Sequence, residues 1–517
     1  MLDLIVERIN LAKTFSLVVV FLVFRSIYYY IREENKIRRL GGRAAKRTTW
    51  VPFGLSVIYD AVRHTRSNKS LELWHKIFSH YGNISNPYTV EANCGGQRLI
   101  FTADEENIKA ILATQFADYG KGKTFHDDWH DFLGDSIFTT DGARWHDSRT
   151  LLRPQFIKDR LSDLEVFETH VSVLIPILGG THDDDTVEAS DIFFRYTLDA
   201  ATHFILGRSV ESLQNRQSRF ADAFGEVQRV QSIIAKSGPL NGWVPRRSFY
   251  AGLKVINEFV HPYIEQTLRL SPEELEKKTK SDTGYTFLHA LAAFTRDRRV
   301  LRDQIVAVLL AGRDTTASTL SWLIYELSRH PQVVRKLRQE VLNRVGLDRP
   351  PTYDDLKSMR YLQHSLNEIL RLYPSVPFNV RVALKDTTLP HGGGPDGLQP
   401  LGVLEGTPIG YSTLVLHRRE DLYPPISTGL PHHLDFAPER WNSWTPRPWT
   451  YIPFNGGPRI CIGQQFALTE MAYTMVRILQ VYDTIECRMD TAPELKADIV
   501  LQPAEGVRVA FKISEKT

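Results

Sequence analysis

Cysteine is scarce in this sequence. Cys94, Cys461 and Cys487 are the three cysteines among 517 residues, and they lie far apart without a CxxC pair. This spacing excludes a CxxC zinc site, and so small and odd a number of cysteines excludes a disulfide framework. We therefore expect the folded body of the protein to reside in a reducing compartment.

A strong charge of one sign is also missing. The 63 Lys and Arg residues nearly balance the 60 Asp and Glu residues, so the formal net charge is +3. No basic stripe with interleaved aromatic residues occurs outside the amino-terminal region, which argues against a nucleic-acid partner. No repeat or low-complexity linker divides the chain, and its 42% hydrophobic residues suit a globular protein with a large core.

A long apolar run near the amino terminus stands out from this average composition. Residues 15–31 are mostly apolar and end in tyrosines, and about 17 residues are marginally enough to span a bilayer. Arg25 lies close enough to one end to extend its charge toward the interface. Residues 32–47 then carry seven Lys or Arg against two Glu, which by the positive-inside tendency places the following body on the cytosolic side.

A cleaved signal peptide is the alternative, but no small-residue cleavage site follows the apolar run. We expect four parts in the chain: a short luminal end at residues 1–14, a transmembrane anchor at 15–31, a basic linker at 32–50 and the folded body at 51–517. A stiff turn at Trp50–Gly54 is expected to start that body.

Most of the body shows apolar residues at helical spacing. The clearest case, residues 301–329, predicts a helix about 43 Å long. Segments typical of strands are short, at 88–90, 98–102 and 506–513, whereas residues 389–404 are rich in Pro and Gly and are expected to form a loop. The predicted fold class is mainly α with small β-sheets.

The segment FNGGPRICIG, residues 454–463, surrounds Cys461 with three glycines, a proline and an arginine. The glycines allow backbone amides to turn toward the sulfur, and a helix expected to begin near Gly463 would lower the thiol pKa and favour thiolate. Such a thiolate can act as a nucleophile, although the sequence identifies no partner base, or as the axial ligand of a haem iron. A buried structural cysteine is the remaining alternative.

A second unusual segment is AGRDTT, residues 311–316, in the middle of the long predicted helix. Gly, Asp and Thr are poor helix formers, and a local conflict of this kind is typical of functional sites. Asp314 and Thr315 together could hold a ligand and relay protons. The alternative is a threonine hydroxyl that is merely bonded to the carbonyl four residues earlier.

Two further motifs contain paired charges. Glu368 and Arg371 lie three residues apart on one predicted helix, a spacing that by itself indicates only an ordinary surface pair. The segment FAPERW, residues 436–441, adds Arg440 ahead of the cysteine loop.

Together and in this order, AGRDTT, ExxR, PERW and FNGGPRICIG resemble the cytochrome P450 family of haem-thiolate monooxygenases. The resemblance extends from about Trp50 to the carboxyl terminus. It implies one mainly helical domain in which haem lies between the long helix and the cysteine loop.

The resemblance also implies roles for individual residues. Cys461 would be the axial ligand of the haem iron, Phe454 would shield its sulfur, and Asp314 and Thr315 would be the acid and alcohol that deliver protons during oxygen activation. The residues implied to hold the haem propionates are Trp145, Arg149, Arg381 and Arg459. The residues implied to form a structural charge triad are Glu368, Arg371 and Arg440.

Longer strings, such as LGDSIFTTDGARWHDSRTLLRPQF, resemble the fungal branch whose known members hydroxylate n-alkanes and fatty acids. Phe378 places a large aromatic where a pocket wall is expected, so oxidation of a polyketide or terpenoid intermediate is the alternative. A haem-binding sensor without turnover and a membrane-anchored cysteine hydrolase are the rival functions. The sensor would not need Asp314 and Thr315, and the hydrolase would not need the charged motifs.

The sequence shows no flavin-type domain. The resemblance therefore implies that electrons from NADPH arrive through a partner, the membrane-bound NADPH-cytochrome P450 reductase, and that O2 is the co-substrate. It further implies a single-pass protein of the endoplasmic reticulum membrane with a cytosolic catalytic domain. The remaining expected partners are membrane lipid and a small hydrophobic substrate.

Overall fold

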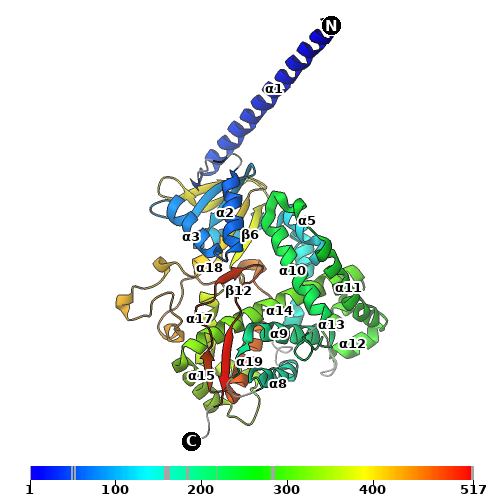
Figure 1. Ribbon diagram of the computed structural model, residues 1–517, viewed down its shortest axis with the longest axis vertical. Coiled ribbons are helices and arrows are strands. Elements are labelled where there is room, and N and C mark those ends of the chain that lie inside the picture. Colours follow the sequence, from blue (N-terminus) through cyan, green and yellow to red (C-terminus); the bar gives the residue numbers. More distant parts are fainter. Residues whose placement is uncertain are drawn as a thin grey trace.

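The computed structural model describes residues 2–47, 51, 54–156, 164–181, 185–216, 218–280 and 286–513. In it a long amino-terminal helix projects from a mainly helical body (Figure 1). Trp50, Pro52 and Phe53 of the expected turn lie outside the described residues, so that turn stays a prediction.

The projecting helix is α1, Leu2–Leu40. Its segment Thr14–Leu40 is long and apolar enough to cross a membrane, and the side chains of residues 15–31 are all exposed. The helix does not stop where the basic segment begins, because Arg, Lys and Glu are good helix formers. Residues 32–40, expected to belong to a linker, are therefore its last turns.

The end of α1 is docked on the body. Ile37 is buried, and the backbone of Gly402 lies so close that a Cβ there would come within 2.5 Å of the Ile37 carbonyl oxygen. Arg43 pairs with Glu34 at 2.7 Å and with Glu91 at 2.8 Å. Part of the basic segment, around Ile37 and Arg43, is thus packed on the body.

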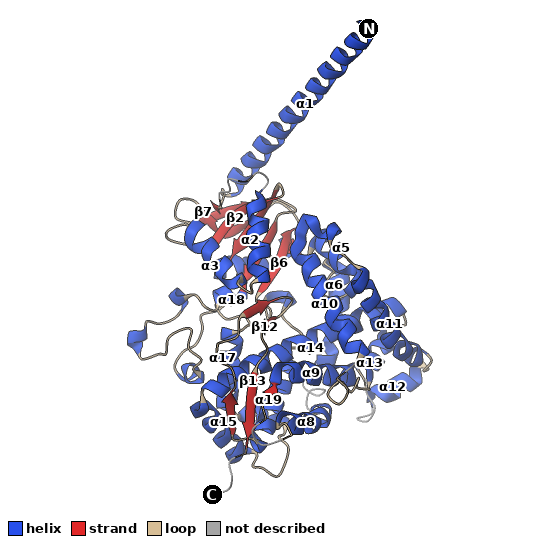
Figure 2. Ribbon diagram, viewed as in Figure 1, coloured by secondary structure: helices blue, strands red, loops and turns tan. Residues whose placement is uncertain are grey.

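A six-stranded sheet lies next to this junction (Figure 2). In spatial order its strands are β1 (Ala45–Lys46), β2 (Thr89–Cys94), β3 (Gln97–Thr102), β9 (Pro408–Ser412), β6 (Phe378–Ala383) and β4 (Tyr119–Gly120). The neighbours β2 and β3 form an antiparallel hairpin, while β3 and β9 run parallel. The strands expected near residues 88–90 and 98–102 are thereby confirmed.

The loop expected at residues 389–404 is wrong. Strands β7 (Thr387–Gly393) and β8 (Gln399–Val403) pair there in an antiparallel hairpin. Its glycines and prolines bend the chain around Gly394 and Gly397, both at positive φ, while Leu389 and Leu401 are fully buried. The Pro and Gly content therefore led to a loop prediction for a segment that forms two short strands with an apolar inner face.

The carboxyl-terminal strands form smaller sheets. Strand β13 (Arg508–Lys512) pairs with β10 (Thr484–Cys487) and β5 (Val187–Glu188), which confirms the strand expected within residues 506–513. Strands β11 (Leu495–Ala497) and β12 (Leu501–Pro503) pair with each other.

The longest helix of the body, α14, spans Arg298–Arg329 and confirms the helix expected at residues 301–329. Its 32 residues correspond to about 48 Å. The Asp297 side chain caps it by accepting the Arg299 amide at 2.8 Å. Its buried face packs along α9 (Ala189–Leu206), and α17 (Arg360–Leu372) and α19 (Gln464–Val481) complete the centre of the core.

The other helices surround this centre and support the sheets. They are α2 (Leu55–Arg66), α3 (Ser70–Tyr81), α4 (Glu105–Lys109), α5 (Gly122–Leu133), α6 (Gly142–Leu152), α8 (Glu165–Leu178), α10 (Arg219–Ser237), α11 (Arg247–Leu268), α12 (Pro272–Lys280), α13 (Phe287–Phe294), α15 (Pro331–Arg344), α16 (Tyr353–Ser358) and α18 (Thr413–Leu416). The fold class is thus mainly α with small sheets, as predicted.

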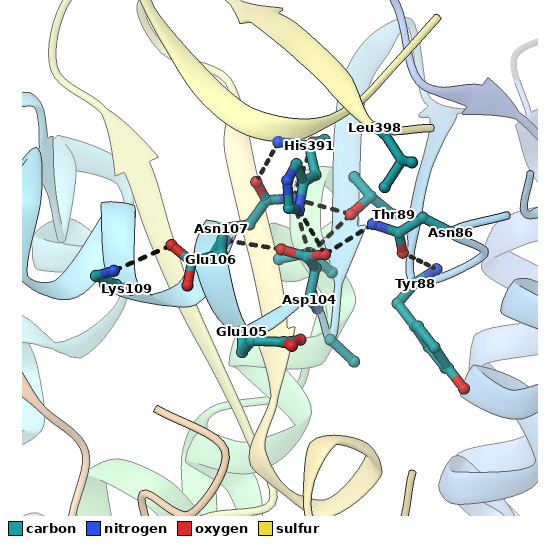
Figure 3. Close-up of polar contacts among 12 residues, drawn as sticks. Asn86, Tyr88, Thr89, Asp104, Glu105, Glu106, Asn107, Lys109, His391 and Leu398 are labelled. Atoms are coloured by element: carbon teal, nitrogen blue, oxygen red, sulfur yellow. Dashed lines mark hydrogen bonds and ion pairs between the residues drawn. The ribbon is translucent and has the colours of Figure 1, made fainter. Parts of the chain in front are cut away.

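A buried polar network fixes the β7–β8 hairpin to the body (Figure 3). Asp104 caps α4 by accepting the Asn107 amide at 2.9 Å, and it also accepts hydrogen bonds from Asn86 at 2.8 Å and from the His391 ring at 3.0 Å. The Asn107 side chain in turn bonds both the carbonyl and the amide of His391. Strand β7 is therefore held by paired polar groups as well as by apolar contacts.

We predict that His391→Gln lowers the free energy of unfolding in a pH-dependent way. The hydrogen bond to Asp104 raises the pKa of His391 above its ordinary value of 6.5. The stabilisation is therefore fully present below about pH 6.5 and lost as pH rises through the raised pKa. Thermal unfolding of the detergent-solubilised protein should show a loss of about 1 kcal/mol near pH 6 that shrinks as the pH rises through the raised pKa.

His261→Gln, a change on an exposed surface of α11, is the control and should show no such trend. A His391→Gln defect that is constant with pH, or that grows as pH rises, would contradict this role of the pair.

Candidate active site

The loop around Cys461 is shaped by close backbone packing. Asn455 and Gly457 both have a φ of 66°, and a Cβ at Gly457 would lie 1.9 Å from the Leu112 carbonyl oxygen. The Cys461 amide donates to the Phe454 carbonyl at 3.0 Å, which closes the loop. Helix α19 then begins at Gln464, directly after Gly463 as expected. The Gly457 position is thus dictated by a neighbouring segment of protein.

The residue Cys461 is exposed to accessible space on one side, while Phe454 of the same loop packs against the core. Desolvation by the surrounding protein raises the pKa of the Cys461 thiol, while the Gly463 amide and the nearby Arg149 act in the opposite direction. The expectation that the helix terminus leaves the thiol with a lowered pKa is therefore wrong, because desolvation outweighs the donors. A metal ion bound to the sulfur would deprotonate it outright.

Three cationic side chains meet near the cysteine loop. Lys121, at the start of α5, and Arg381, on β6, both donate to the Asn379 side chain, at 3.2 Å and 3.1 Å. Arg459, on the cysteine loop, pairs with Asp141 at 2.6 Å. Burial and the two arginines hold the pKa of Lys121 well below its usual range.

The available negative charge does not balance this cation cluster, Lys121, Arg381 and Arg459. Asp141 already accepts the backbone amides of Lys121 and Gly122 in addition to Arg459. Burial and Arg381 lower the pKa of Arg459 to about 10. Its Nε atom is buried without a hydrogen-bond partner among the described residues. The cluster is therefore suited to receive anionic groups such as carboxylates.

Helix α6 connects this cluster to the cysteine loop. The Arg459 guanidinium lies 4.7 Å from the centre of the Trp145 ring. One turn later, Arg149 donates to the Ile460 carbonyl at 3.1 Å, next to Cys461. The structure thus brings the predicted residues Trp145, Arg149 and Arg459 together at the loop.

Asp314 lies on the unbroken helix α14 and is buried. Its carboxylate accepts a hydrogen bond from Gln228 of α10, and its Oδ1 atom lies 3.5 Å from Arg313 without a hydrogen-bond partner among the described residues. Burial raises the pKa of Asp314, although Arg313 and Gln228 oppose this effect. Asp314 can therefore hold a proton closer to neutral pH than an ordinary aspartate.

The neighbouring Thr315 donates its hydroxyl hydrogen to the Ala311 carbonyl at 2.7 Å. This is the local bond considered as the alternative to a functional role. The hydroxyl has to rotate away from it before it can donate to a ligand.

Glu368 and Arg371 form a bidentate pair, with both nitrogen–oxygen distances 2.8 Å and neither side chain exposed. Arg440 approaches the same carboxylate at 3.3 Å, and the Trp441 ring nitrogen donates to it at 3.0 Å. The remaining donors of the two arginines bond mainly to backbone carbonyls of residues 431–435. The charge triad predicted from the sequence thus lies together in the core rather than on the surface.

Residues 53–511 match the sequence pattern of the family described as Cytochrome P450. The chain belongs to the cytochrome P450 family. It is a monooxygenase, and this P450 family uses haem iron with O2 and NADPH-derived electrons that a reductase delivers.

Several fungal relatives are similar over nearly the whole chain. Cytochrome P450 monooxygenase pvhE of Talaromyces variabilis is 49% identical, covering 99% of this chain and 97% of the relative. Cytochrome P450 52A1 of Candida tropicalis is 40% identical, covering 93% and 90%. Cytochrome P450 52A13 of Debaryomyces hansenii is 39% identical, covering 89% of each.

The residues of this P450 fit a haem group. Cys461 is exposed to accessible space, and the two arginines of the cation cluster carry more positive charge than Asp141 can neutralise. A haem would place its iron on the sulfur and its two carboxylates near the cations. Sequence motifs did not identify Lys121, Asn379 or Gln228, because each reaches the site from a separate element.

We predict that Glu368→Gln lowers the free energy of unfolding of this P450 by about 3–5 kcal/mol, because it leaves two buried guanidinium groups without their carboxylate. Glu258→Gln is the control, since Glu258 pairs with Arg219 at 3.2 Å in an exposed position and its loss should cost about 1 kcal/mol or less. Chemical denaturation and the amount of bound haem measure both variants. An equal loss of unfolding free energy in the two variants would contradict a larger contribution from the buried triad.

Proposed function

We propose that this P450 inserts one oxygen atom of O2 into a C–H bond of a small hydrophobic substrate, with fatty acids and n-alkanes as the first candidates. The observation that carries the proposal is the accessible Cys461 beside the arginines Arg381 and Arg459, of which Asp141 forms an ion pair with Arg459 only. Haem held there supplies the activation of oxygen. The protein's own residues hold the group, supply protons and exclude water.

Cys461 is proposed as the axial ligand, with the Phe454 carbonyl and Arg149 fixing the loop on either side of it. Phe454 is partly buried and packs against the main core, which supports a shielding role beside the sulfur. Lys121, Arg381 and Arg459 are proposed to bind the two haem carboxylates. Trp145 supports Arg459 through its ring.

Asp314 and Thr315 are proposed to move protons into the site. The raised pKa of Asp314 makes it a proton donor at higher pH than an exposed aspartate. Gln228 holds this carboxylate from α10, so movement of α10 relative to α14 would release it. Thr315 takes part when its hydroxyl turns from the Ala311 carbonyl.

Two observations bear on the substrate. The resemblance of the longer sequence motifs to the alkane- and fatty-acid-hydroxylating branch supports the first candidates, and a lipophilic polyketide or terpenoid intermediate stays the alternative. Phe378 does not decide between them, because its ring stacks on Trp74 at a centroid distance of 5.1 Å. Its aromatic character is explained by packing of β6 against α3.

The proposed location is the endoplasmic reticulum membrane, with α1 as a single span and the catalytic domain in the cytosol. The exposed apolar surface of α1 and the basic residues that follow it support this orientation. The proposed electron donor is the NADPH-cytochrome P450 reductase in the same membrane. Anchorage there would also bring the active site close to substrates dissolved in lipid.

We predict that Thr315→Ala diverts electrons from product to peroxide. Product formed per NADPH consumed should fall about tenfold or more, because a positioned proton donor contributes at least that much. Thr315→Ser keeps the hydroxyl and should restore most of the coupling. Unchanged coupling in Thr315→Ala, measured by peroxide release and product yield, would remove Thr315 from the proposed role.

We also predict that fatty acids or n-alkanes shift the haem absorption band of the purified protein on binding. They should then yield hydroxylated products that depend on NADPH and the reductase. Lipophilic polyketides and terpenoids of comparable solubility form the comparison set. Binding and turnover confined to that set would refute the first candidates and favour the alternative.

A further inference from the structure

A group of potential metal ligands lies at the carboxyl-terminal end of α5, away from the cysteine loop. His126 and His130 stand four residues apart on this helix, and Asp135 follows it. One ligand atom from each residue lies within 4.8 Å of the other two. None of the three contributes to the proposed oxygenation chemistry.

The fold brings these three side chains together in two ways. The i, i+4 spacing places both histidines on one face of α5, and their ring centres are 5.1 Å apart. Gly134 ends the helix with a φ of 54° and donates its amide to the His130 carbonyl at 2.8 Å. The chain then turns back, so that Asp135 faces the two rings.

The position of this turn is set by helix α14. A Cβ at Gly134 would lie 1.9 Å from the carboxyl carbon of Asp303, so a larger residue does not fit there. The Asp135 amide donates to the same Asp303 carboxylate at 2.9 Å. The Asp135 backbone is therefore fixed by the central helix, independently of any contact between Asp135 and the histidines.

The polar contacts of His126 resemble those of a metal site. A hydrogen bond joins His126 to Asp135 at the place where a metal ion would lie between them. His126 Nε2 lies 2.7 Å from Asp135 Oδ1, and His126 Nδ1 faces Asp127 Oδ1 at 3.6 Å. A carboxylate on the far side of a ring is the arrangement that orients metal-bound histidines. Arg144 also approaches Asp135 Oδ1, at 3.5 Å, and would compete with a metal for that oxygen.

We propose that His126, His130 and Asp135 bind one Zn²⁺ ion. Two imidazoles and one carboxylate are ligands typical of zinc, whereas Mg²⁺ and Ca²⁺ prefer oxygen alone. Tetrahedral zinc needs ligand atoms about 3.4 Å apart, so a bound ion would move these atoms by roughly an ångström. Because His130 and Asp135 are exposed, water completes the coordination.

Zinc bound here joins the last turn of α5 to the segment that Asp303 fixes to α14. Helix α5 begins beside Lys121 of the cation cluster and packs against α10 through Gln231, which donates to the Asp128 carbonyl at 2.9 Å. The ion thus stiffens a helix that connects the cluster with α10. This effect does not depend on which substrate the enzyme oxidises.

The test is a zinc titration of the full-length, haem-loaded protein in detergent after treatment with a chelator. Calorimetry with ZnCl₂ should show one equivalent bound with His126 and His130 present. His130→Ala should weaken that binding at least tenfold, and His126→Ala should do the same. The exposed control His261→Ala on α11 should bind as the unaltered protein does.

Hydrogen exchange provides a readout that a purely structural role of the histidines would not move. Zinc should slow exchange of the amides of residues 130–136 in the unaltered protein and in His261→Ala, but not in His130→Ala. Binding of equal strength in all four proteins, or protection that persists in His130→Ala, would overturn the proposal.

Discussion

Glu368 shares its carboxylate between two guanidinium groups in a region that solvent does not reach. Burying three charges is expensive unless each is fully paired, and here Arg371 and Arg440 use their remaining donors on the backbone of residues 431–435. The cluster therefore fixes the path of the chain from α17 to the segment before the cysteine loop. Apolar residues could fill the same volume, but they could not donate hydrogen bonds to the carbonyls of residues 431–435.

The cation cluster differs from the triad, because its charges are not fully paired. Its positive charges are buried with less negative charge than they need, since Asp141 is already engaged by two backbone amides. Such an arrangement lowers the stability of the protein by itself and becomes favourable when an anionic group binds. The contrast between a satisfied cluster and an unsatisfied one distinguishes the structural arginines, Arg371 and Arg440, from those suited to binding, Arg381 and Arg459.

Asp314 connects the site to the elements around it. Gln228 reaches it from α10, and Arg313 contacts the same glutamine at 3.0 Å. Helix α10 is thus joined through side chains to the buried carboxyl proposed as a proton donor. Burial raises the pKa of this carboxyl and so suits it to proton transfer. Burial also increases the contribution of its hydrogen bond with Gln228 to the stability of the fold. The contacts with Gln228 and Arg313 therefore both position the Asp314 side chain and influence its pKa.

The sequence by itself determined the helical fold class, the long helix around Asp314, the loop that presents Cys461 and the residues of the charge triad. The fold class and the long helix follow from periodicity within short segments, which local physics governs, whereas the triad and the role of the cysteine loop follow from the resemblance to the P450 family. Only the tertiary structure decided that α1 continues through the basic segment, that residues 387–403 pair as a hairpin, and that desolvation dominates at the Cys461 thiol. The tertiary structure alone also placed Lys121 beside Arg381 and Gln228 beside Asp314. Each results from contact between residues far apart in the chain, and neither charge balance nor burial at such a contact is encoded in the residues nearby.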